Sequence, residues 1–229
     1  RVNNAAKAMT LPYAVGADLD VAAAPYARRQ VITPANPVTG TPAVMESDES
    51  LRERAMLGPE GFSVAGPPGA YVKFARDASA QVLDASCISP SKGVVQVTVL
   101  SRAEGGVPDQ ALLDTVLSTV SDENVRPLTD AVIVTAAEIL PFTIDAKIKT
   151  FAGPDSDVVM AEARRRLDDY LARSYRLGRD ITRAALTAAL CPDGVQDVIL
   201  VQPAASIIAT PSQAALCQGI TLTYAGLAE

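Results

Sequence analysis

The stretch "PFTIDAKIKT" (residues 141–150) alternates apolar and polar side chains along its length. The apolar residues are Phe142, Ile144, Ala146 and Ile148. The polar residues between and after them are Thr143, Asp145, Lys147 and Lys149. A period of two residues is that of a β-strand with one buried face and one exposed face. The sequence on both sides of this strand must therefore supply partner strands and a covering layer.

Amphipathic helices are predicted on both sides of this strand, and their apolar residues recur at helical spacing. Pro108 begins one of these helices, and Thr182 is a candidate N-cap of another. The predicted helices are residues 69–79, 108–120, 155–175 and 182–190.

Further strands are predicted where β-branched residues alternate with polar ones or form short apolar runs. The turn "PSKG" joins the first two, and Val95, Val97 and Val99 alternate with polar residues in the second. The predicted strands are residues 82–89, 94–101, 131–138, 195–201 and 220–224. The helix–strand–strand order that begins at residue 69 recurs about 40 residues later.

These elements predict an α+β fold of repeated helix–strand–strand units with antiparallel strand pairs, preceded by an extended N-terminal helical and connector segment. A Rossmann sheet would need strands and helices in strict alternation. Three regions are predicted. Residues 1–45 hold the end of an N-terminal helical region and a Pro/Thr-rich connector, residues 46–150 hold two α-β-β units, and residues 151–229 form a C-terminal helix-rich α+β unit.

The N-terminal region contains a predicted turn and a predicted connector. "GADLD" (Gly16–Asp20) is interpreted as a turn, because aspartates next to glycine make side-chain turns more often than they bind a metal. "TPANPVTGTP" (residues 33–42) is too polar and too rich in proline and glycine for a core element. We expect it to be an exposed connector.

A short helix is predicted after this connector. Ser50 followed three residues later by Glu53 matches a capping box, and Gly58 with Pro59 ends the helix. The acidic residues Glu46, Asp48 and Glu49 precede or begin it. A helix N-terminus favours negative charge, so this cluster is interpreted as helix stabilisation rather than as a metal site.

Composition limits the possible functions. The 229 residues carry a formal charge of −6, include no histidine and no tryptophan, and contain no apolar run long enough to span a membrane. An acidic chain is a poor ligand for nucleic acid, and the absence of histidine removes the usual general base and most catalytic zinc sites. No signal peptide is predicted. Three widely spaced cysteines, Cys87, Cys191 and Cys217, predict free thiols made in a reducing cytosol.

The loop "PEGFSVAGPPGAY" (Pro59–Tyr71) holds the candidate nucleophile Ser63. A nucleophile elbow requires Gly-x-Ser-x-Gly, but here the second glycine, Gly66, comes one position late. A Ser–Lys pair remains an alternative, although no lysine is marked for it. No phosphate-binding loop motif is present. The loop is interpreted as a connector.

Two charged stretches have structural interpretations. Arg164–Arg166 cover nearly a full helical turn and are followed by Asp168 and Asp169, which predicts a solvated or interface-facing helix rather than an anion site. Adjacent carboxylates on a helix point about 100° apart and do not converge. In the turn before residue 131, Arg126 and Asp130 are expected to pair. No catalytic, cofactor-binding or metal-binding residue is predicted.

Seven stretches together resemble the baseplate J-like family, the baseplate wedge proteins of P2-like contractile-tailed phages and related tail-like particles. They occur in order over the whole chain and read "TPAVMESDESLRER", "EGFSVAGPPGAY", "GVVQVTVLS", "NVRPLTDAVIVTAAEI", "GPDSDVVMAEAR", "LGRDITRAALTAAL" and "GVQDVIL". Members carry a helical N-terminal extension, and the segment before Asp20 resembles its end. The resemblance therefore implies a chain that lacks the start of that region.

The resemblance implies a structural role without catalytic residues. We expect a baseplate wedge component that joins neighbouring wedge and tail proteins around the hub, with further copies of itself in a six-fold assembly, and that rearranges on contraction. The expected location is the virion tail baseplate, after assembly in the host cytoplasm. No cofactor, nucleic acid, membrane insertion or small-molecule substrate is expected. Edge strands such as Ile220–Tyr224 are expected to be able to extend the sheet of a neighbour.

Three alternatives remain open. The first is an equivalent baseplate component of an R-type tailocin or other contractile injection particle. The second is a serine hydrolase that uses Ser63, and the third is a small-ligand-binding protein. A hydrolase requires turnover that Ser63→Ala abolishes. A ligand-binding protein requires a discrete apolar cavity in a stable monomer.

Overall fold

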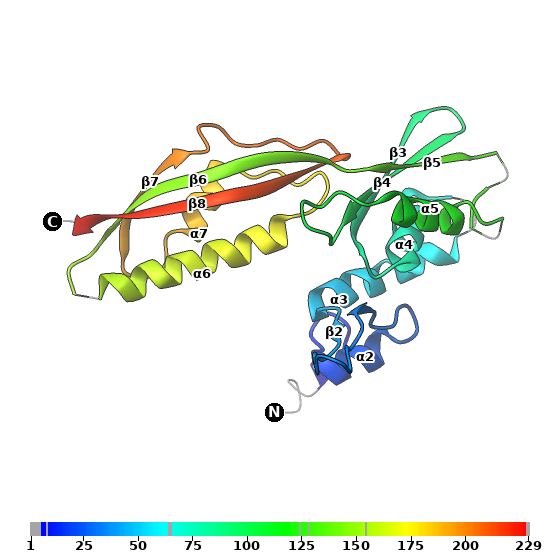
Figure 1. Cartoon of the computed structure of the whole chain (residues 1–229), viewed down its shortest axis with the longest axis horizontal. Helices are drawn as coiled ribbons and strands as arrows, with labels where there is room; N and C mark the ends of the chain where they lie inside the picture. Colours follow the sequence, from blue (N-terminus) through cyan, green and yellow to red (C-terminus); the bar gives the residue numbers. More distant parts are fainter. Residues whose placement is uncertain are drawn as a thin grey trace. The chain divides into compact units, whose positions relative to one another are not determined.

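The computed structural model describes residues 6–7, 9–63, 66–123, 125–127, 129–153 and 155–227. The chain folds into two compact units, Arg1–Ala136 and Ala137–Glu229. Each unit has a three-stranded sheet and a buried apolar cluster of its own (Figure 1). The α+β class predicted from the sequence is confirmed, because helices pack against small mixed sheets in both units.

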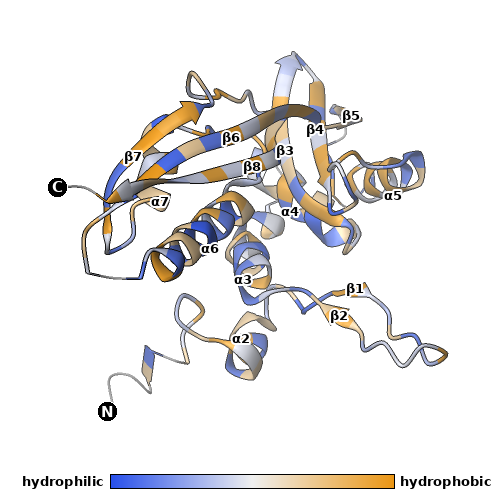
Figure 2. Ribbon diagram, turned by 60° about the vertical axis from the view of Figure 1, so that its left-hand side comes forward, coloured by the Kyte–Doolittle hydropathy of each residue, from blue (hydrophilic) through white to orange (hydrophobic). Residues whose placement is uncertain are grey.

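The first unit begins with a helical segment and a small hairpin and continues into a helix-covered sheet. Its described elements are, in chain order, α2 (Gly16–Ala23), β1 (Val31–Thr33), β2 (Val44–Met45), α3 (Asp48–Met56), the 3-10 helix η1 (Gly58–Phe62), α4 (Pro68–Ala78), β3 (Val82–Ser91), β4 (Val94–Ser101), α5 (Gln110–Val120) and β5 (Ala131–Ala136). The predicted connector, residues 33–42, is exposed and forms the long loop between β1 and β2 (Figure 2).

The predicted turn at Gly16–Asp20 is wrong, because these residues begin helix α2. Gly16 alone adopts a positive φ, 54°, and its N–H donates to the Asp48 carboxylate at 2.8 Å. Leu19 and Ala23 are fully buried one turn apart. Burial of this apolar pair, which the sequence pattern does not show clearly, outweighs the local preference of Gly and Asp for turns.

The predicted capping box is also wrong. The N-cap of α3 is Ser47, whose side-chain oxygen accepts the N–H of Ser50 at 3.3 Å. Ser50 lies inside the first turn, is buried, and donates its hydroxyl to Glu46 at 2.8 Å. Serine suits an N-cap at either position. Ser47 takes this role because the buried hydroxyl of Ser50 is already bonded to Glu46.

The sheet of the first unit has the strand order β3-β4-β5. β3 and β4 form the predicted antiparallel hairpin, and β5 lies parallel to β4. Helix α5 connects these two parallel strands, so β4, α5 and β5 form a crossover unit. α4 and α5 contribute Tyr71, Ala75, Val116 and Val120 to one apolar cluster with the sheet.

The second predicted α-β-β unit does not form. β5 pairs with β4 rather than with the strand that follows it, and that strand, β6 (Glu138–Thr150), joins the sheet of the second unit. The structure therefore divides at 136/137, whereas the sequence places a boundary at 150/151. The buried face of β6 needs β7, β8 and α6 to cover it, and all three follow it in the chain.

The second unit is built around β6, which is paired on both sides (Figure 1). β7 (Val195–Gln202) runs antiparallel to one side of it and β8 (Gln213–Leu227) parallel to the other. The predicted alternation in β6 is confirmed, because Phe142, Ile144, Ala146 and Ile148 are all 9% exposed or less. They pack beneath α6 (Ser156–Ser174) and α7 (Arg183–Ala189).

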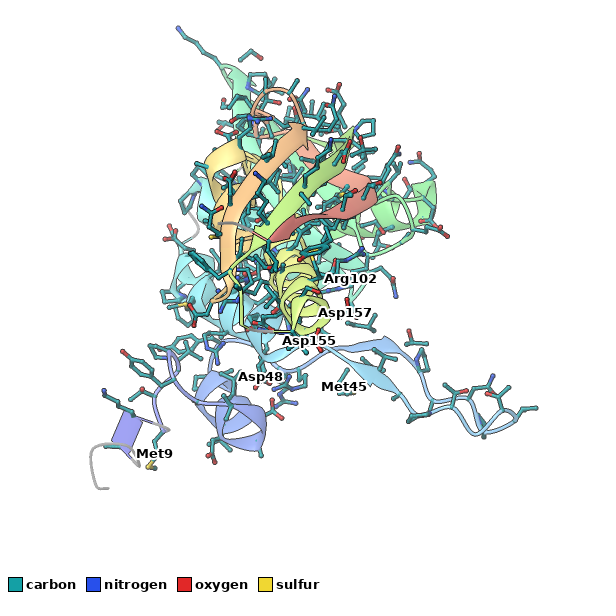
Figure 3. All side chains as sticks on the ribbon, turned by 90° about the vertical axis from the view of Figure 1, so that its left-hand side faces the viewer. Met9, Met45, Asp48, Arg102, Asp155 and Asp157 are labelled. Atoms are coloured by element: carbon teal, nitrogen blue, oxygen red, sulfur yellow. The ribbon has the colours of Figure 1, made fainter. Side chains whose placement is uncertain are left out.

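α6 and α7 both have side-chain N-caps, and the cap of α7, Thr182, is the predicted one. The carboxylate of Asp155 accepts the N–H of Asp157 at 2.9 Å, and Figure 3 shows both residues at the start of α6. The hydroxyl of Thr182 accepts the N–H of Ala185 at 3.2 Å. Within the described part of the chain, no helix has the length and apolar character needed to cross a membrane.

Leu167 is fully buried on α6, together with Val159 and Ala163 at intervals of one turn. We expect Leu167→Ala to lower the free energy of unfolding by about 2–4 kcal/mol, because it removes buried methyl groups and leaves a cavity. Val158→Ala on the same helix is the control, since Val158 is 66% exposed and should change stability little. Urea unfolding of both variants measures the difference. Equal effects would contradict the predicted packing of α6.

Candidate functional site

The loop Pro59–Tyr71 does not present Ser63 as an isolated nucleophile. Ser63 follows η1, and its N–H donates to the carbonyl of Glu60 at 3.3 Å. Lys73, whose side chain packs beside Gly61, directs its ammonium to Asp77 at 2.9 Å. The basic group that a Ser–Lys pair would require at this loop is therefore in an ion pair of its own.

The loop is held against the turn that precedes β5. Gly66 has a φ of 71°, and a Cβ at this position would lie 2.7 Å from Pro127 and 3.2 Å from the Asp130 carboxylate. The hydroxyl of Tyr71 donates to the same carboxylate at 2.8 Å. Arg126 donates to the backbone carbonyl of Asp130 at 3.0 Å, so the predicted Arg126–Asp130 contact exists but uses the main chain.

Burial and the Asp130 carboxylate set the acidity of two groups in this region. Burial first, and then the hydrogen bond to Asp130, raise the pKa of Tyr71. Burial first, and then the negative charge of Asp130, raise the pKa of Cys87 to about 11. Both side chains are held in their neutral forms near pH 7. The contacts fix the connector in place and supply no activated group.

A buried polar network joins α3, α4 and the hairpin segment, and Arg54 is its centre. Arg54 donates to both carboxylate oxygens of Glu46, at 2.9 and 2.8 Å, and to the carbonyl of Arg28 at 2.6 Å. It also pairs with Asp77 of α4. The side chains of Arg54 and Glu46 are only 5% and 1% exposed. Sequence inspection missed this pair, since its members are eight residues apart and separated by a helix start.

Hydrogen bonding outweighs desolvation at this pair. Burial alone would raise the pKa of Glu46, but hydrogen bonds from Arg54 and Ser50 hold it below its ordinary value of 4.5. Burial alone would lower the pKa of Arg54, but Glu46 and Asp77 raise it. Both groups therefore stay charged, and each has enough partners to offset the loss of water. Arg102 extends the network by donating to the hydroxyl of Ser50 at 2.8 Å.

The acidic residues considered as metal ligands are distributed among different partners. Arg29 binds Asp20 and Asp48, both at 2.7 Å, while Glu46 belongs to the Arg54 pair. Asp48 and Glu49 lie in the first turn of α3, as the charge argument predicts. The structure brings no three metal-binding side chains together among the residues that it describes.

The arginine stretch of α6 forms an exposed ion-paired surface, as predicted. Arg164 pairs with Asp168 at 2.9 Å, and Arg165 pairs with Glu162 and Asp169 at 2.8 and 2.7 Å. Arg166 also pairs with Glu162, at 3.0 Å. Because all of these side chains are at least 36% exposed, their contribution to stability is small.

Strand β8 presents an uncovered sheet edge. It pairs with β6 along one side, and no strand of the described chain lies along its other side. The prediction that Ile220–Tyr224 lies at an edge is confirmed, but the strand extends over 15 residues. None of the 15 is charged or a proline. This edge is the part of the second unit best suited to pair with another chain.

A groove of about 300 Å³ separates β8 from α6. It is lined by Asp168, Leu171, Ala172, Tyr175, Ile181, Ala215, Leu216, Cys217 and Ile220. Neither β6 nor β7 contributes to this lining, so the groove lies at the β8 margin of the helix–sheet interface. Its apolar surface continues the surface of the edge strand.

Family models and a curated relative both match this chain to the same protein family. Residues 1–36, 63–136 and 142–223 match, in order, the models of the baseplate J-like N-terminal domain, central domain and protein C-terminal domain. The chain is 43% identical over 232 residues to baseplate protein J of Escherichia phage P2. The aligned region covers 100% of this chain and 77% of that protein.

A solved structure resembles the fold. A chain in the cryo-EM structure of the anti-feeding prophage baseplate, 6-fold symmetrised, superposes with a TM-score of 0.52 and 17% sequence identity. The similarity covers 78% of this chain and 42% of that chain, so this chain spans about two fifths of the length of that relative.

Removal of one charge from the buried network tests its contribution. We expect Glu46→Gln to lower the free energy of unfolding at pH 7 by about 3 kcal/mol, because it leaves the buried Arg54 charge without its bidentate partner. Glu49→Gln is the control, since Glu49 is exposed in the first turn of α3 and should change stability by about 0.5 kcal/mol at most.

The pH dependence gives a second readout of the same variant. A carboxylate with a lowered pKa in the folded state stabilises fully above its ordinary pKa, and this stability is lost as pH falls through the folded value. The difference between wild type and Glu46→Gln should therefore shrink below pH 4.5. Urea unfolding at pH 7 and pH 3.5 measures it. A difference that stays constant between these pH values would contradict the assigned ion pair.

Thiol labelling tests the environment of Cys87. With a pKa of about 11, roughly one Cys87 thiol in a thousand is ionised at pH 8. We expect iodoacetamide to modify Cys87 at least about tenfold more slowly than the exposed Cys191. Mass spectrometry of the tryptic peptide Asp77–Lys92 follows the reaction, and labelling in 6 M urea provides the unfolded control. Equal rates in the folded protein would show that the Cys87 region is open to reagent.

Proposed function

The chain belongs to the baseplate J-like protein family, and on this basis we propose that it is a structural component of the baseplate of a contractile injection system. The observation that carries the proposal is the 43% identity to baseplate protein J of phage P2 over the whole chain. The fold similarity to an anti-feeding prophage baseplate chain supports the same assignment independently of close sequence identity.

We further propose that this component joins neighbouring wedge proteins around the hub and takes part in assembly and in rearrangement on contraction. The six-fold symmetrised relative supports the presence of several copies per particle. In the described chain, two compact units joined at 136/137 offer separate surfaces to different partners. The proposed location is the tail baseplate of the virion, with assembly in the host cytoplasm.

The proposed role is structural rather than catalytic. Ser63, the candidate nucleophile, lies in a connector whose neighbouring lysine is paired with Asp77. The candidate metal ligands Asp20, Glu46 and Asp48 pair with arginines. These contacts support the assignment of no catalytic, cofactor-binding or metal-binding residues. An equivalent place in an R-type tailocin is the same role in a related particle.

Quantitative mass spectrometry of purified contractile tail particles from the source organism tests the proposal. We expect the peptide "DASAQVLDASCISPSK" (Asp77–Lys92) in intact particles, at a ratio to sheath and hub peptides that corresponds to a multiple of six copies per particle. The cell lysate is the control for expression. If the peptide is present in the lysate but absent from intact particles, the proposed structural role is wrong.

A further inference from the structure

Apart from two irregularities in its pairing, strand β8 lacks the features that normally protect the edge of a sheet. At about 3.3 Å per residue, its 15 residues present an edge roughly 50 Å long. Natural edge strands are shortened, charged, bulged, interrupted by proline or covered. The pairing register of β8 shifts twice, between Cys217 and Gly219 and between Tyr224 and Leu227, and the strand has no charged residue or proline. The opposite edge, β7, has eight residues, includes Asp197 and is followed at once by Pro203.

The backbone of β8 has unused hydrogen-bonding capacity on its outer side. In a parallel pair, alternate residues direct their N–H and C=O groups away from the partner strand. Gly178 donates to the carbonyl of Gln213 at the start of β8, at 2.9 Å. From Ala214 onward, no main-chain group from outside the sheet is seen to bond to the strand within the described residues. A row of donors and acceptors is therefore open to another extended backbone.

We propose that the outer edge of β8 binds an extended segment of another protein of the baseplate, which adds a fourth strand to the β7-β6-β8 sheet. This inference rests on the proposed function, since it names a contact through which the component joins a neighbour. The added strand satisfies the outer main-chain groups of β8, and its side chains supply the specificity.

The two faces of the sheet define the side chains that this segment needs. Ile220 and Leu222 lie beside the buried Ile144 and Ala146 of β6, so this face is directed toward α6. Beside Cys217 and Ile220, the side chains that an added strand directs to this face would enter the apolar groove between β8 and α6. These positions require apolar residues, because a charged group there would lose water without a free partner.

The opposite face of the sheet is polar. Thr221 and Thr223 are exposed and lie beside Asp145 and Lys147 of β6. The remaining side chains of the added strand lie on this face and can be polar. The predicted ligand is therefore an extended segment with alternating apolar and polar residues and no charge on its apolar side. About six to eight residues would fill the edge from Cys217 to Tyr224.

A second copy of β8 fits this edge less well than an isolated segment. Each β8 lies beside its own α6, whose Arg164 and Asp168 are exposed at the margin where the groove lies. A symmetric pair of β8 strands would bring two such helices together and place these ion pairs against apolar groove surface. Burial of exposed ion pairs is costly. An extended segment from another protein brings no such helix.

Hydrogen exchange and crosslinking in assembled particles test the inference. In the protein alone, the outward-facing amides within residues 214–227 should exchange rapidly while the alternate amides are protected by β6. In intact particles, we expect exchange of the outward-facing set to slow at least about tenfold. A photocrosslinking residue at Thr223 should capture a peptide with an alternating apolar pattern from another tail protein.

Matched charge variants provide the control. Thr221→Lys with Thr223→Lys adds charge to the β8 edge, and Gln196→Lys with Gln202→Lys adds the same charge to β7. Both pairs are exposed, so the thermal stability of the free protein should change little. We expect the β8 pair to reduce incorporation into particles at least about fivefold relative to the β7 pair, because lysines oppose strand addition at an edge.

The outcomes separate this inference from the proposed function. If the protein is in the particles but its β8 amides exchange as rapidly as in the free protein, the strand-addition inference is wrong and the proposed function stands. If Thr223 crosslinks to a second copy of this chain, the assignment to another protein is wrong. If the protein is absent from the particles, the proposed function itself fails.

Discussion

The pairing of β6 on both sides is the constraint on which the second unit depends. β7 and β8 bond to opposite sides of this strand, and its alternate residues are buried beneath α6. A slip of one residue would turn Asp145 and Lys147 into the core and Ile144 and Ala146 to solvent, so burial fixes a single register. The position of β8 as an edge follows from this arrangement, because no described strand comes after it in the sheet.

The N-terminal part of the first unit is organised by polar as well as apolar burial. Its apolar cluster is made of small and medium residues such as Ala55 and Leu51. Arg54, which lies between these two in the sequence, pairs with Glu46 and Asp77. Such a pair contributes little net stability when compared with an apolar replacement, but loss of one partner is expensive. The contacts therefore hold α3 to α4 in one arrangement, since few others would satisfy all of the buried charges.

The sequence predicts local structure here better than it predicts pairing. The alternation in β6 and the helical spacing in α4 and α6 depend on residues close in the chain, and these elements are confirmed. The parallel pairing of β4 with β5 was missed, because a period of two residues does not specify partner or direction. The full length of β8 was missed because its register shift near Gly219 interrupts the alternation.

The polar contacts were harder to predict than the strands. Glu46 looks like one of several solvated acids in the sequence, and only the fold brings Arg54 and Asp77 to it. Gly16 has a turn-like φ, yet it begins a helix because Leu19 and Ala23 have a buried surface to meet. In both cases the deciding partner lies on another element, and single-sequence patterns contain no information about it.

In the second unit, the charged residues of α6 contrast with the uncharged strand β8. α6 carries dense, exposed ion pairs from Arg164 to Asp169, while the neighbouring edge strand carries none. Charged residues on an edge would oppose unwanted pairing, and they would also oppose a required partner strand. In a component that joins other proteins, charge that is confined to the helix leaves the edge available. The uncharged edge is therefore better explained by a partner that covers it than by the stability of the isolated unit.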